Sequence, residues 1–177
     1  AAIGAGFFHH NMNLALGEAR YADELDRALY NAVLPGVSLQ GNTYFYENPL
    51  EAGPKRARWA WHGCPCCPPM FLKIMGALPG CIYAQDEGGI YVNLFVGSRA
   101  EVRLSGGKAV LRQATRYPWD GQVKFFVEPE RDMEFALNVR LPAWCDEPKL
   151  QVNGKPLALF EKVRGYARLH RKWQAGD

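Results

Sequence analysis

The chain has 177 residues, of which 48% are hydrophobic and 22% are charged, and its formal net charge at pH 7 is +3. This composition is typical of a globular protein, and the length suffices for one ordinary domain or for parts of two. Lysine and arginine are scattered, and no apolar run approaches the roughly 20 residues that span a bilayer, so we expect neither nucleic acid nor membrane as a partner.

Neither end of the sequence has the features expected of a natural chain terminus. The apolar run from Ala1 to Phe8 begins without a Met or a helix-capping residue. At the other end, Gly176-Asp177 is a turn signal that normally leads into another strand. We therefore expect that an N-terminal part of the same protein is missing from this chain.

The first third of the chain predicts helices. Apolar residues over 7–16 suit a buried helix that stops at Gly17, and those over 21–33 predict a second helix that ends before Pro35. These two helices would form an antiparallel hairpin. Residues 37–60 look irregular, and a short third helix is expected to open at Pro68-Pro69, because proline suits the first helical turn.

After Gly80 the sequence changes to short segments rich in β-branched and aromatic residues, separated by Gly and Pro turns. Such spacing predicts a β-sandwich. The expected strands cover residues 82–83, 90–96, 101–104, 108–112, 123–127, 134–141, 149–152 and 166–169. We place a domain boundary near residue 85, with an all-α part over 1–85 and an antiparallel β-sandwich, truncated at its C-terminus, over 86–177.

Three of the five cysteines lie within the four residues Cys64-Pro65-Cys66-Cys67. A disulfide scaffold would spread its cysteines, so this clustering indicates thiolate chemistry or metal binding, and it favours a reducing compartment. Adjacent thiolates can bind one zinc ion, with Cys64 or His62 as further candidate ligands. Two alternatives are ordinary buried thiols and a Cys64/Cys67 redox pair, although the redox motif lacks its usual preceding strand.

Several segments occur in the order found in one known family. The sequence resembles the β-L-arabinofuranosidases of glycoside hydrolase family 127 and their close relatives over essentially its whole length. The segments that carry this resemblance are Arg20–Asp23, Arg27–Asn31, Tyr44–Glu51, Gly63–Pro69, Gly89–Ser98 and Leu141–Cys145.

This resemblance implies the last helices of an (α/α)6 barrel catalytic domain followed by a β-sandwich. It implies a retaining, zinc-dependent exo-glycosidase that releases L-arabinofuranose or a related sugar from β-linked glycans. Cys66 and Cys67 would bind the zinc together with a Glu-x-Cys motif located before Ala1. Cys66 would be the nucleophile, Tyr46 would line the sugar site, and the general acid/base would lie outside the chain. The isolated fragment is then expected to be inactive.

Two functions from other classes remain open. A zinc-stabilised structural or carbohydrate-binding module would bind glycans through exposed tryptophans such as Trp119 or Trp144. A thiol redox protein would cycle Cys64 and Cys67. An incomplete helical barrel would expose apolar faces, which allows a homo-oligomer. We expect a bacterial, cytoplasmic location, and the sequence assigns no role to His62.

Overall fold

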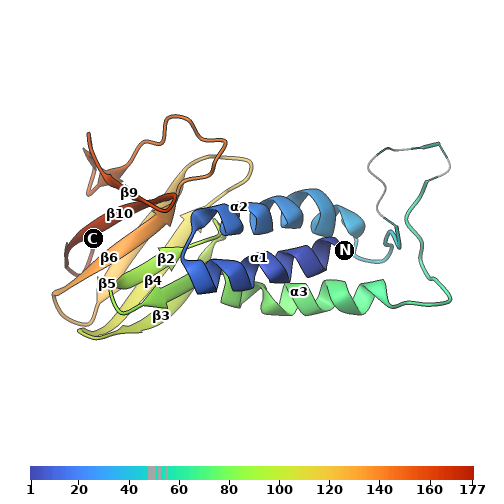
Figure 1. Cartoon of the computed structure of the whole chain (residues 1–177), viewed down its shortest axis with the longest axis horizontal. Coiled ribbons are helices and arrows are strands. Elements are labelled where there is room, and N and C mark those ends of the chain that lie inside the picture. The colour runs from blue at the N-terminus through green and yellow to red at the C-terminus, as the bar shows by residue number, and fades with distance from the viewer. Residues whose placement is uncertain (48–50, 52, 55) are drawn as a thin grey trace.

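A computed structural model describes residues 1–47, 51, 53, 54 and 56–177 of the chain. Figure 1 shows the helices side by side at one end of the molecule and the strands gathered at the other end. The motif residues Asn48, Pro49 and Leu50 lie outside the described residues. Within the described part, no helix is both long and apolar enough to cross a membrane.

The helical part contains the expected hairpin and a longer third helix. Helix α1 ends at Gly17, which adopts the left-handed conformation (φ 63°) and donates its N–H to the Asn13 carbonyl. The expected third helix begins at the cysteine cluster and runs through Pro79 to Ile82, farther than its apolar pattern suggested. The helical elements are α1 Ala2–Leu16, α2 Ala19–Ala28, the π-helical turn η1 Leu29–Val33, the 3-10 turn η2 Leu34–Gly36 and α3 Cys67–Ile82.

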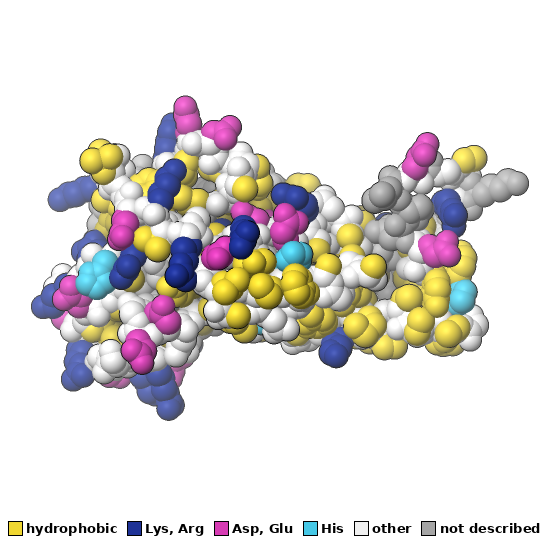
Figure 2. Space-filling view, in the orientation of Figure 1, with side chains coloured by type: hydrophobic (Ala, Val, Ile, Leu, Met, Phe, Trp, Pro, Cys, Tyr) yellow, Lys and Arg dark blue, Asp and Glu magenta, His cyan; other side chains and the backbone are white. Residues whose placement is uncertain are grey.

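A small apolar core joins the three helices. An added methyl group at Gly6 of α1 would lie 3.2 Å from Ile74 of α3 and 3.3 Å from Leu25 of α2, so this glycine permits close packing. Other apolar side chains on the helices remain exposed, and Figure 2 shows hydrophobic groups gathered over the helical part of this face. They include Phe8, Leu14, Leu16, Leu34, Met70 and Leu72.

The strands form two main sheets and a small hairpin. The five-stranded sheet has the order β1-β2-β6-β10-β9, the three-stranded sheet has the order β3-β4-β5, and β7 pairs with β8. The bounds are β1 Tyr83–Asp86, β2 Gly89–Val92, β3 Ser98–Leu104, β4 Gly107–Thr115, β5 Val123–Pro129, β6 Met133–Arg140, β7 Gln151–Val152, β8 Lys155–Pro156, β9 Glu161–Val163 and β10 Tyr166–Trp173. Every predicted strand overlaps one of these, whereas the short polar strands β8 and β9 were not predicted.

The expectation of an entirely antiparallel sandwich is wrong at one pair, because β2 and β6 run parallel. The chain leaves β2, builds the whole three-stranded sheet and returns to β6, and such a long crossover permits parallel pairing. Gly89 of β2 lies opposite Ala136, where a methyl group on residue 89 would meet the Ala136 carbonyl oxygen at 2.0 Å. The close pairing of β2 and β6 therefore requires glycine at this position.

The two main sheets share one hydrophobic core. Side chains from β2 and β6 of one sheet pack with side chains from β3, β4 and β5 of the other, as in a sandwich. Trp173 lies in this core and donates its indole N–H to the Phe135 carbonyl at 2.9 Å. The core comprises Ile90, Val92, Phe95, Val102, Ala109, Leu111, Val127, Met133, Phe135, Leu137 and Trp173.

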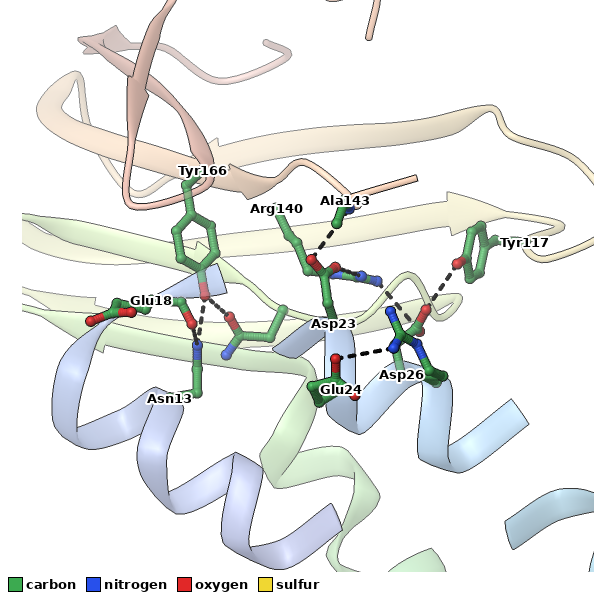
Figure 3. A network of polar contacts seen from close by, with 11 residues as sticks. Asn13, Glu18, Asp23, Glu24, Asp26, Tyr117, Arg140, Ala143 and Tyr166 are labelled. Carbon is green, nitrogen blue, oxygen red and sulfur yellow. Dashed lines mark hydrogen bonds and ion pairs between the residues drawn. The ribbon is translucent and has the colours of Figure 1, made fainter. Parts of the chain in front are cut away.

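A buried ion cluster joins α2 to the sheets. Arg140 at the end of β6 pairs with Asp23 and Asp26 of α2, and its side chain is only 1% exposed (Figure 3). Burial alone would lower the pKa of Arg140, but the charges of Asp26 and Asp23 raise it, so the guanidinium stays charged. Tyr117, from the loop after β4, donates its hydroxyl to Asp26 at 2.9 Å, and the Ala143 N–H bonds to Asp23.

A second buried contact joins α1 to the five-stranded sheet. The Tyr166 hydroxyl of β10 donates to the Asn93 side-chain oxygen at 2.6 Å and accepts from the Asn13 amide at 2.8 Å (Figure 3). Burial raises the pKa of Tyr166 to about 12, so this hydroxyl remains a donor at any physiological pH. The helices and the sheets are therefore connected by buried polar contacts as well as by apolar packing.

We predict that Arg140→Met lowers the free energy of unfolding by about 3–5 kcal/mol, because it leaves two buried carboxylates without a counter-charge. The matched control is Arg27→Met, which removes an exposed i,i+3 pair with Glu24 on the same helix and should cost about 0–1 kcal/mol. Urea denaturation measures both changes. Equal losses in the two variants would contradict a stabilising role for the buried cluster.

Candidate functional site

The cysteine cluster lies at the start of α3, at the end of the helical part that is far from the sheets (Figure 1). Cys66 occupies the N-cap position and Cys67 is the first helical residue. A helix N-terminus carries a partial positive charge and thus favours a thiolate over a neutral thiol. Cys66 is exposed and Cys67 is half-buried, so a small molecule can reach Cys66.

The two adjacent sulfurs have a spacing that fits a shared zinc ion. Their Sγ atoms are 3.9 Å apart, and two thiolates at about 2.3 Å from one tetrahedral zinc would be about 3.8 Å apart. Among the described residues, however, no group of three or more His, Cys, Asp or Glu side chains could hold a metal ion. Cys66 and Cys67 thus fit as part of a zinc site whose other ligands would come from elsewhere.

His62, one of the two other candidate ligands, bonds to the backbone of Cys64, whereas the Cys64 thiol lies close enough to Cys66 to help lower its pKa. The backbone N–H of Cys64 donates to His62 Nδ1 at 3.1 Å, and the same nitrogen is 3.2 Å from the Cys64 carbonyl oxygen. The imidazole therefore remains tied to the backbone of Cys64 whichever tautomer it adopts.

Tyr46 is brought to Cys66 although twenty residues separate them. The Tyr46 hydroxyl oxygen lies 3.1 Å from Cys66 Sγ. When Cys66 is ionised, this hydroxyl donates to its sulfur, and together with the neighbouring Cys67 thiol it lowers the pKa of Cys66. In return, the hydrogen bond to Cys66 and the charge of its thiolate raise the pKa of Tyr46 to about 12. Burial raises the pKa of Cys67, so of the two adjacent thiols Cys66 ionises more readily.

Trp59 and His62 form an aromatic group with Tyr46 that the sequence did not reveal. The His62 ring stacks on Tyr46 at 4.2 Å between centroids and on Trp59 at 4.8 Å, with interplanar angles of 21° and 7°. Isolated β-bridges from Val37 to Tyr44 and from Tyr44 to Trp59 bring these segments together. The density of aromatic residues in Trp59-Ala60-Trp61-His62 was the only sequence signal for this arrangement.

Other candidate residues lie outside this group. Trp119 and Trp144 are 88% and 65% exposed and belong to loops of the sheet half, so the glycan-binding alternative stays a prediction. Cys81 is buried in the helical core, its thiol donates to the Ala77 carbonyl, and burial raises its pKa, as expected for an ordinary core thiol. Cys145 is half-buried in the sheet half.

Comparison with protein families gives two matches that together cover most of the chain. Residues 1–80 match the catalytic domain of the GH127 β-L-arabinofuranosidases, and residues 89–177 match the middle domain of the same enzymes. A curated relative is the non-reducing end β-L-arabinofuranosidase of Bifidobacterium longum subsp. longum. It is 30% identical in an alignment of 173 positions that covers 88% of this chain and 26% of that protein.

Solved structures of the family superpose closely on the chain. A GH127 β-L-arabinofuranosidase from Geobacillus stearothermophilus T6 matches with a TM-score of 0.92 and 35% identity, over 98% of this chain and 29% of that one. A second GH127 β-arabinofuranosidase matches with a TM-score of 0.90 and 33% identity, over 99% of this chain and 30% of that one. The chain thus spans less than a third of the length of these relatives, and it belongs to the β-L-arabinofuranosidases of glycoside hydrolase family 127.

Proposed function

We propose that the chain is part of a retaining, zinc-dependent exo-glycosidase that releases L-arabinofuranose, or a related sugar, from β-linked glycans. The observation that supports this most directly is the contact of Cys66 Sγ with the Tyr46 hydroxyl on one side and with the Cys67 thiol on the other. An exposed sulfur with a lowered pKa is the side chain that a thiol nucleophile requires.

The helices over residues 1–85 would be the last helices of an (α/α)6 barrel, and residues 86–177 would form a β-sandwich domain. Exposed apolar side chains on α1 and α3 support this assignment, because barrel helices bury such surfaces against neighbouring helices. The rest of the barrel would come from the missing N-terminal part of the protein. If these surfaces stay uncovered, they favour association of the chain with itself.

Cys66 and Cys67 would bind the zinc ion together with a Glu and a Cys located before Ala1. Their spacing suits this role, as the 3.9 Å distance between the sulfurs indicates. When bound, zinc keeps its thiol ligands deprotonated at neutral pH.

In the proposed reaction, the lone pair of Cys66 Sγ forms a bond to the anomeric carbon while the glycosidic C–O bond breaks. The electron pair of that bond leaves with the oxygen, which takes a proton from a carboxylic acid outside this chain. A water molecule then attacks the same carbon, gives its proton to that carboxylate and returns the C–S electron pair to sulfur. Two inversions produce net retention.

Tyr46 would act at two points in this site. Its hydroxyl contacts Cys66, so it can hold the sulfur in one orientation and stabilise its negative charge before attack. Its ring would line the space for the sugar, since it lies directly beside the nucleophile. We propose a bacterial, cytoplasmic location, because clustered cysteines favour a reducing compartment.

We expect Cys66→Ser in the full-length enzyme to lower kcat by at least about a thousandfold, because an alcohol is far less nucleophilic than a thiolate near pH 7. Hydrolysis of an aryl β-L-arabinofuranoside measures this loss. Cys145→Ser is the control, since that thiol belongs to the sheet half and should leave kcat within about twofold. A Cys66→Ser enzyme with normal activity would rule out the proposed nucleophile.

In the metal-free protein, iodoacetamide should label Cys66 at lower pH than Cys67. The reagent reacts with thiolates, and the pKa of Cys66 lies below the usual thiol value whereas that of Cys67 lies above it. Tyr46→Phe removes the donated hydrogen bond, so the labelling profile of Cys66 should move to higher pH. Tyr44→Phe is the control, because the Tyr44 hydroxyl has no bonding partner among the described residues. Mass spectrometry follows both sites, and identical profiles in wild type and Tyr46→Phe would contradict the assigned contact.

The purified full-length protein should contain about one zinc ion per chain, measured by elemental analysis. Cys67→Ser should reduce zinc affinity by about a hundredfold or more, because it removes one of the expected ligands. Cys145→Ser should retain the metal. A Cys67→Ser protein with undiminished zinc affinity would show that the sulfur pair is not a metal site.

A further inference from the structure

We propose that His62 is a positioning residue that fixes Cys66 Sγ against the Tyr46 hydroxyl. This inference rests on the proposed function of Cys66 and adds a residue to that site. His62 touches neither sulfur among the described contacts, so its effect would pass through Cys64 on one side and through Tyr46 on the other.

Four contacts form a closed ring that starts and ends at His62. The Cys64 N–H donates to His62 Nδ1 at 3.1 Å, and the Cys66 N–H donates to the Cys64 carbonyl at 2.9 Å. Cys66 Sγ meets the Tyr46 hydroxyl at 3.1 Å. The Tyr46 ring then stacks on the His62 ring at 4.2 Å. Because this ring of four contacts is closed, moving any one of these groups strains or breaks its contact with the next group.

The closed ring matters because its members are poorly held by the rest of the molecule. Cys64 and Cys66 are exposed, and Tyr46 and His62 are only half-buried, so packing alone does not restrict their rotamers. A nucleophile must be held near its attack geometry, and a displacement of about 1 Å can cost about a hundredfold in rate. Contacts among the four residues supply the rigidity that a buried site would obtain from its surroundings.

Two further observations favour His62 over other side chains at this position. Its ring nitrogen accepts from the Cys64 N–H in one tautomer and faces the Cys64 carbonyl at 3.2 Å, as a donor, in the other. Trp59 covers the ring at an interplanar angle of 7°, which holds the imidazole parallel to Tyr46. A flat ring with a polar atom at its edge satisfies both contacts at once, which neither phenylalanine nor asparagine can do.

The test uses three substitutions in the full-length enzyme. His62→Ala removes both contacts and should lower kcat about tenfold to a hundredfold, with KM changed less than about twofold. His62→Phe keeps the stack and His62→Asn keeps the polar contact, so each should recover part of the loss. An alanine variant with kcat within twofold of wild type would overturn the proposal, and so would phenylalanine and asparagine variants no better than alanine.

Trp61→Ala is the matched control. Trp61 precedes His62, is 72% exposed and stacks on no other ring in the described part of the chain. Its substitution should leave kcat within about twofold. A loss equal to that of His62→Ala would mean that the loop merely needs large side chains, and would overturn the positioning role.

A double-mutant cycle with Tyr46→Phe tests whether His62 acts through Tyr46. If both belong to one ring of contacts, the double variant should lose much less than the product of the two single losses. Independent, multiplicative losses would contradict the proposal. In the metal-free protein, the rate at which iodoacetamide labels Cys66 should fall in His62→Ala as well, because the sulfur is no longer held against the Tyr46 hydroxyl. This second readout survives if the enzyme proves inactive on arabinofuranosides, so failure of the proposed function and failure of this inference can be told apart.

Discussion

The buried pairing of Arg140 with Asp23 and Asp26 fixes the helices on the sheets. Arg140 ends the central strand β6, and both carboxylates belong to α2, so a single guanidinium connects the two halves of the chain. A buried charge must be matched, which permits few alternative docking positions for α2. Tyr117 and Ala143 complete the bonds of the carboxylates, and Phe95 packs against the guanidinium.

The residues of the cysteine site are held in place differently from those around Arg140. Its residues are exposed or half-buried, and they are held by contacts with one another rather than by a surrounding core. Helix α3 supplies its only regular element within the described part, with Cys66 and Cys67 at the N-terminus. The site therefore combines the N-terminus of helix α3 with a loop whose side chains contact the sulfur of Cys66. Such an open face agrees with a site completed by another part of a longer protein.

Much of the local structure was predictable because it depends on neighbouring residues. Gly17 ends α1 as its conformational freedom suggests, and residues 134–141 alternate closely enough to indicate β6. The family was recognisable from the cysteine motif and its flanking segments. The sequence did not reveal the parallel pairing of β2 with β6, because strand partners depend on contacts between distant residues.

For the site, the sequence predicts a chemistry that stays a prediction, and the family resemblance adds Tyr46 without its contact with Cys66. Adjacent cysteines indicated a metal or a nucleophile, but no spacing rule relates Tyr46 to a sulfur twenty residues later. The role of His62 depends on two contacts that only the folded loop creates, one through its ring face and one through its ring edge. Trp59 was overlooked for the same reason, since stacking between loop residues leaves no periodic pattern.

Helix α3 also connects the position of the sheets to the position of the Cys66 sulfur. Its 16 residues make a rod about 24 Å long, which leads into β1 at one end and carries Cys66 at the other. A tilt of about five degrees at the sheet end would swing the far end by about 2 Å, given that length. Substitutions deep in the sheets can thus misplace the sulfur without touching it.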